Sequence, residues 1–82
     1  MEIFVGNLSY SCINDELKTL FEKHGTVTST KITTDERTGQ SKGFGFVEMP
    51  NLEEAQTAIA ALQGLDFMGR ALRLAEARPR KV

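Results

Sequence analysis

Apolar and polar residues follow two different periods along this chain of 82 residues. Alternation with period two, in segments rich in β-branched or aromatic residues, predicts half-buried strands. Four segments have this pattern: residues 2–8, 27–34, 42–49 and 70–75. Two segments place apolar residues at helical spacing on one face: residues 14–24 and 51–63. The pattern therefore predicts the order strand, helix, strand, strand, helix, strand.

Residues with capping and turn chemistry mark the ends of these elements. Asn14 can cap the first helix by accepting from exposed backbone N–H groups, and Gly25 ends that helix. Asn51 opens the second helix and Gly64 ends it. Segment 35–41 has turn composition, so we expect an antiparallel hairpin between the second and third strands.

This order of elements predicts an α+β fold of the ferredoxin-like βαββαβ type. In that fold a four-stranded antiparallel sheet carries both helices on one face and leaves the other face open. We expect one domain over residues 1–79, followed by a short basic tail at 80–82. Ten apolar side chains are expected under the helices: Ile3, Val5, Leu17, Phe21, Ile32, Val47, Ile59, Leu62, Leu72 and Leu74.

Three aromatic rings are expected on the open face. Because successive side chains of a strand point to opposite faces, burial of Val47 places Lys42, Phe44 and Phe46 on the open side. Phe4 does the same in the first strand. Exposed rings are costly unless something flat covers them. The glycines beside the rings are expected to keep this surface low, so that a ligand can lie close.

Exposed rings with nearby cations suit a single-stranded nucleic acid. Bases stack on aromatic rings at about 1–3 kcal/mol each, and Lys and Arg neutralise phosphates. The alternative is that the rings form a second core, covered by a tail or a partner. Three rings on one sheet beside Lys42 favour the nucleic-acid interpretation.

Two segments resemble the signatures of the RNA recognition motif family. Residues 42–49, Lys-Gly-Phe-Gly-Phe-Val-Glu-Met, match its octamer at every specified position except the last, and 3–8, Ile-Phe-Val-Gly-Asn-Leu, match its hexamer. The resemblance covers residues 1–79, and the compact chain is similar to small single-domain bacterial members of the family. The octamer usually ends in Phe or Tyr; Met49, which stands there, is expected to face the core.

The resemblance implies a role for each matching residue. Phe4 and Phe46 would stack on neighbouring bases, Phe44 would insert between their two sugars, and Lys42 would meet the phosphate between them. Other residues surround this centre, and strand alternation places Lys31 and Arg73 among them on the open face. We expect further nucleic-acid contacts from Lys31, Arg73, Asn7, Tyr10 and the tail residues Arg78, Arg80 and Lys81. For Tyr10, packing beside the first loop is an equally good interpretation, and for the tail a solvated terminus is equally good.

Charge and cysteine content refine this picture. The net charge is −1 and the pI about 5.8, which argues mildly against a nucleic-acid partner, but acidic residues gather in the helical segments and basic ones towards the C-terminal end. Glu2 and Glu48 on the open face would repel phosphate, so we expect modest affinity. Cys12 is the only cysteine, which excludes an internal disulfide and suggests a reducing compartment, the cytoplasm.

Other classes of function have weaker support. With no leader-like segment and no apolar run near the roughly 20 residues that span a bilayer, we expect neither secretion nor membrane insertion. We see no catalytic constellation, so we expect a monomeric non-enzyme with no cofactor, metal or small-molecule substrate, whose partner is single-stranded RNA or DNA. The alternatives are a protein-interaction module with the same fold and a small enzyme such as an acylphosphatase, which shares only the fold.

Overall fold

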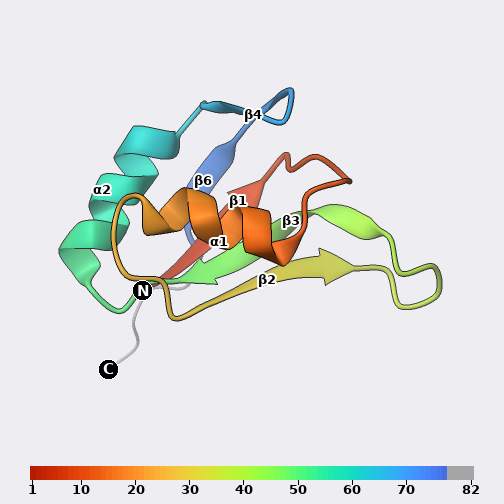
Figure 1. The fold of residues 1–82 in the computed structure, drawn as a ribbon, viewed down its shortest axis with the longest axis horizontal. Helices are drawn as coiled ribbons and strands as arrows, with labels where there is room; N and C mark the ends of the chain where they lie inside the picture. Colours follow the sequence, from red (N-terminus) through yellow and green to blue (C-terminus); the bar gives the residue numbers. More distant parts are fainter. Residues whose placement is uncertain (78–82) are drawn as a thin grey trace.

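A computed structural model describes residues 1–77 as a sheet with two helices packed on one face (Figure 1). The main elements are β1 (Glu2–Gly6), α1 (Asn14–Glu22), β2 (Ser29–Thr34), β3 (Ser41–Glu48), α2 (Leu52–Leu62) and β6 (Arg73–Glu76). The sheet has the order β2-β3-β1-β6, and its neighbouring strands are antiparallel. The predicted fold class is confirmed.

The core between the sheet and the helices has the expected composition. Nine of the ten side chains expected there are buried, and Ile59 is only partly buried while packing against the core. Phe21 of α1 is the largest fully buried side chain. Val47 and Met49 have no exposed surface, whereas Phe46, directly before Val47 in the sequence, is half-buried. The predicted register of β3 is therefore correct, and Met49 fills the core as expected.

The first helix does not begin as predicted. Its N-cap is Ile13, whose backbone N–H donates to the Glu16 carboxylate at 3.2 Å. Asn14 is the first helical residue, and its Oδ1 accepts from the backbone N–H of Ile32 at 3.0 Å. Asn14 therefore joins α1 to β2 instead of capping its own helix. The second helix begins as predicted, because Asn51 Oδ1 accepts from the N–H of Glu54 at 3.0 Å.

The fourth predicted strand, 70–75, is divided in the structure. Arg70–Ala71 forms β5, which pairs with β4 (Asp66–Phe67), and only residues after Leu72 join the main sheet as β6. The turn between β4 and β5 has positive φ at both central residues, 56° at Met68 and 87° at Gly69. This is the backbone of a two-residue hairpin turn, in which Asn or Asp usually precedes the Gly. Methionine in that position concealed the turn from sequence patterning.

Both edge strands of the sheet are covered by side-chain amides. At β6, the Gln63 side chain accepts from Leu74 N–H at 3.0 Å and donates to Leu74 C=O at 2.7 Å. Gln63 thus makes the pair of bonds that a neighbouring strand would make. At β2, Asn14 satisfies the N–H of Ile32. Exposed strand edges invite pairing with other chains, and these two amides close part of each edge.

Candidate nucleic-acid interface

Three phenylalanine rings form one cluster on the open face of the sheet. We call Phe4, Phe44 and Phe46 the aromatic surface. Phe4 lies directly opposite Phe46 across β1 and β3. The ring centroids are 5.8 Å apart for Phe4–Phe44 and for Phe4–Phe46, and 6.2 Å apart for Phe44–Phe46. These distances are typical of stabilising aromatic pairs, so each half-buried ring is held by the other two.

Gly6 is the glycine that keeps the aromatic surface low. A Cβ on Gly6 would lie 2.8 Å from Cε2 of Phe4, so the Phe4 ring leans over Gly6. It leans towards Phe44, which is the cross-strand partner of Gly6. The octamer glycines have other roles. A Cβ on Gly45 would meet the Lys31 carbonyl oxygen at 2.5 Å, and one on Gly43 would meet Cε1 of Tyr10 at 2.9 Å. These two glycines permit close packing against β2 and against the Tyr10 ring, which corrects the expectation that they make room for a ligand.

Cations flank the aromatic surface on several sides. Lys31 of β2 is opposite Phe46, and Arg73 of β6 is opposite Gly6. Both are exposed, as is Lys42. Three residues of β3, 42–44, lie opposite one residue of β2. In this stretch β3 thus has two residues more than β2. Because two is an even number, side chains on either side of the irregularity keep the same alternation of faces, and Lys42 lies on the same face as Phe44.

The other end of the open face is acidic. Glu2 and Glu48 are cross-strand partners, two residues along from Phe4 and Phe46 and therefore on the same face. One oxygen of Glu48 accepts from the N-terminal ammonium of Met1 at 3.3 Å, which balances part of this charge. The charge of the open face thus changes along the strands. It is negative at the end with Glu2 and Glu48 and positive at the end with Lys42 and Arg73.

Asn7 and Tyr10 lie beyond the aromatic surface, and the structure joins them to a residue that the sequence did not single out. Both Nε and Nη2 of Arg70 donate to Oδ1 of Asn7, at 3.2 and 2.9 Å, and Asn7 Nδ2 donates to the Ala71 carbonyl at 2.7 Å. The Arg70 guanidinium lies 5.8 Å from the centroid of the Tyr10 ring. Both polar atoms of the Asn7 side chain are thus hydrogen-bonded within the protein. Arg70 was missed because the strand pattern hid the hairpin that presents it.

Two other candidate features are the basic tail and the single cysteine. Arg78, Arg80 and Lys81 lie outside the described residues. Cys12 is buried, and burial, helped by the nearby Glu16 carboxylate, raises the pKa of its thiol. Within residues 1–77 no group of three His, Cys, Asp or Glu side chains could hold a metal ion. No helix of that described part is long and apolar enough to cross a membrane.

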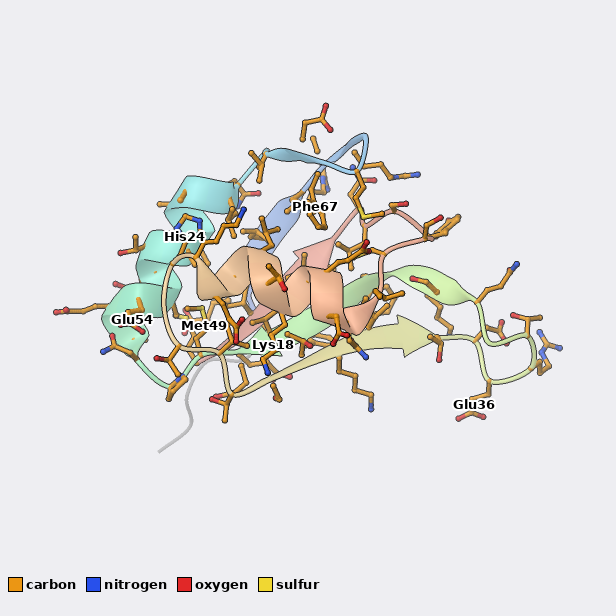
Figure 2. All side chains as sticks on the ribbon, in the orientation of Figure 1. Lys18, His24, Glu36, Met49, Glu54 and Phe67 are labelled. Carbon is orange, nitrogen blue, oxygen red and sulfur yellow. The ribbon has the colours of Figure 1, made fainter. Side chains whose placement is uncertain are left out.

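A hollow lies on the helical side of the protein. It has a volume of about 340 Å³ and is lined by α1 and the β4–β5 hairpin, with Leu20 and Phe67 among its apolar walls and Asp15 and Glu16 among its polar ones. Phe67 points from the hairpin towards α1 (Figure 2). With two carboxylates, Asp15 and Glu16, against the single ammonium of Lys23, the lining is net negative and suits phosphate less than the open face does. The open face is therefore the candidate interface.

Comparison with known proteins agrees with the geometry. Residues 3–73 match the family model described as RNA recognition motif. The provisionally named RNA-binding protein RbpE of Nostoc sp. is 48% identical over 81 residues, covering 99% of this chain and 82% of RbpE. The crystal structure of RNA binding protein PG1 has a TM-score of 0.93 at 44% identity, covering 100% of this chain and 99% of that one. A structure of the Rna15 RRM with bound RNA (GU) has a TM-score of 0.86 at 26% identity, covering 99% and 86%.

The two signature segments also occupy the places that their chemistry requires. Most of the hexamer lies in β1 and most of the octamer in β3, and these strands are neighbours at the centre of the sheet. Their rings meet on the open face while their alternate residues fill the core. The chain therefore belongs to the RNA recognition motif family.

Proposed function

We propose that this domain binds a short single strand of RNA across its open face, with two neighbouring bases stacked on Phe4 and Phe46. The observation that carries the proposal is the direct pairing of Phe4 with Phe46, at 5.8 Å between ring centroids and both partly open to solvent. Phe44, in contact with both rings, lies between the two sugars. Each stacked base contributes about 1–3 kcal/mol.

The charges of the open face orient the sugar-phosphate backbone. Phosphates lie towards Lys42 and Arg73, because Glu2 and Glu48 repel them at the opposite end. Lys42 meets the phosphate between the stacked nucleotides, and Lys31 meets one beside Phe46. Single-stranded DNA is a second ligand of the same site, since stacking needs no 2′-OH. The domain acts by binding, with no catalytic step and no small-molecule substrate.

The domain acts as a monomer in the cytoplasm in this proposal. The amides of Asn14 and Gln63 close part of each sheet edge, which opposes strand pairing between copies. The single buried thiol, Cys12, suits a reducing compartment. The hollow between α1 and the hairpin is the place where the alternative, a protein-interaction module, would bind a peptide.

The test compares one sequence in three forms at a single salt concentration. Fluorescence anisotropy should show binding of a labelled RNA of about four nucleotides, measurable binding of the matching DNA, and much weaker binding of a blunt duplex, because paired bases cannot present their faces to the rings. NMR shifts should concentrate on the open face of β1 and β3. Equal affinity for single strand and duplex, or shifts confined to α1 and the hairpin, would refute the proposal.

A further inference from the structure

Arg70 is an exposed arginine whose guanidinium is nevertheless held in one orientation. Two of its nitrogens, Nε and Nη2, donate to the same oxygen of Asn7. Asn7 is fixed in turn by its bond to the Ala71 carbonyl and by a left-handed backbone, with φ of 59°. The Tyr10 ring, 68% exposed, lies against the guanidinium. An arginine side chain has high rotational freedom, so contacts with the Asn7 amide and the Tyr10 ring restrict it strongly.

These contacts leave the edge of the guanidinium formed by Nη1 and Nη2 available for a further partner. An arginine has five N–H donors, and the bonds to Asn7 use one edge, that of Nε and Nη2. The edge formed by Nη1 and Nη2 keeps parallel donors that match two oxygens of one phosphate. Asn7 is neutral, and none of the ion pairs found within residues 1–77 involves Arg70. Its positive charge is therefore oriented without being neutralised.

The cluster of Arg70, Asn7 and Tyr10 lies at the end of the sheet that carries Lys42 and Arg73. Asn7 directly follows Gly6, whose cross-strand partners are Phe44 and Arg73. Tyr10 lies against Gly43, which stands between Lys42 and Phe44 in β3. At strand spacings of about 4.8 Å, these neighbours place the cluster within about one nucleotide of the aromatic surface. Glu2 and Glu48 lie at the opposite end.

We infer that Arg70 binds the phosphate of a nucleotide beyond the two that stack on Phe4 and Phe46, and that Asn7 is its positioning residue. The inference rests on the proposed function, because it assumes that those bases occupy the aromatic surface. Arg70 extends the phosphate path of Lys42 and Arg73 past the end of β1. The domain thus engages at least three nucleotides, and the third is held through its backbone and not by stacking.

The length of the oligonucleotide isolates Arg70 from the stacking site. A dinucleotide with a single linking phosphate offers nothing to Arg70, whereas a hexanucleotide does. Arg70→Ala should leave dinucleotide binding, followed by NMR titration, within about twofold of the parent. It should weaken hexanucleotide binding about tenfold, as expected for a lost charge-assisted contact. The slope of log affinity against log salt should fall by about 0.7 for that one phosphate.

A charge-matched control and a positioning variant complete the test. Lys18→Ala removes one charge from α1, on the helical side of the sheet (Figure 2), and should leave hexanucleotide binding within about twofold. Asn7→Gly keeps the left-handed backbone and the charge but removes the amide. It should weaken hexanucleotide binding with an unchanged salt slope, and the Arg70 Nε–H resonance should lose its protection from solvent exchange.

Each outcome separates the inference from the proposed function. An unchanged salt slope in Arg70→Ala, or an equal loss with the dinucleotide and the hexanucleotide, would overturn the phosphate role of Arg70 and indicate a purely structural one. If Phe46→Ala also bound the hexanucleotide like the parent, base stacking itself would fail. An Arg70 effect beside a strong Phe46 effect supports both.

Discussion

Substitution of Phe46 by alanine tests base stacking more directly than any other change. Phe46 is half-buried on the open face, so its removal leaves no closed cavity in the core. The Phe46 ring makes T-shaped contacts with Phe4 and Phe44, at 5.8 and 6.2 Å between ring centroids. The variant therefore removes one stacking ring and two aromatic contacts, and leaves every cation in place.

The expected loss of binding follows from one base. Removing a stacked ring costs about 1–3 kcal/mol, which raises the dissociation constant between about fivefold and about 150-fold. The salt dependence should stay unchanged, because no phosphate contact is lost. The two lost aromatic pairs, at about 0.5–1.5 kcal/mol each, should lower the free energy of unfolding by about 1–3 kcal/mol. Domains of this size have more stability than that, so the variant should remain folded.

Val47→Ala is the matched control for stability. Val47 is the next residue of the same strand, points into the core and has no exposed surface. Loss of its two methyl groups, at about 0.8 kcal/mol each, with a cavity term added, should lower the free energy of unfolding by about 2 kcal/mol.

Urea unfolding followed by circular dichroism would match the two variants, and anisotropy with a short RNA would compare their binding. The control should bind within about twofold of the parent. If Phe46→Ala bound as well as Val47→Ala does, the reasoning from ring geometry to base stacking would be wrong.

Three further experiments test separate parts of the structure. Lys42→Ala should weaken RNA binding and lower the salt slope by up to about 0.7, as measured by anisotropy between low and moderate salt; an unchanged slope would remove Lys42 from the phosphate path. Gln63→Ala opens the β6 edge and should lower the free energy of unfolding by about 1–2 kcal/mol and promote self-association in sedimentation experiments. Gln56→Ala, at an exposed position of the preceding helix α2, should do neither. Cys12, buried and with a raised pKa, stays mostly a protonated thiol at pH 8, so it should react slowly with a thiol reagent in the native protein and rapidly in denaturant; fast native reaction would contradict its burial.

Local pattern accounts for most of the fold and for the centre of the site. Alternation in 42–49 assigns Phe44 and Phe46 to one face and Val47 to the other, because side chains of a strand change face at every residue. The burial of Val47 and the exposure of the rings agree with that assignment. The same reasoning located Lys31 and Arg73 on the open face, opposite Phe46 and Gly6.

Patterning was less reliable where the backbone departs from regular geometry. The hairpin at Met68-Gly69 interrupts what looked like one strand, because two residues with positive φ reverse the chain without the usual Asn or Asp. Asn14 has the chemistry of a helix cap, but its amide reaches the N–H of Ile32 instead. For Asn14, a contact with a distant part of the chain outweighed the local signal.

The sequence by itself determined the class of this protein, since hydrophobic period and two signature segments are properties of neighbouring residues. It also determined that three rings share the open face. Only the tertiary structure decided how those rings are supported and what surrounds them. Arg70 and Asn7 are 63 positions apart, and Gln63 meets Leu74 across the sheet edge. Such contacts depend on strand order and on one turn, and residue spacing alone carries no information about which distant groups that turn brings together.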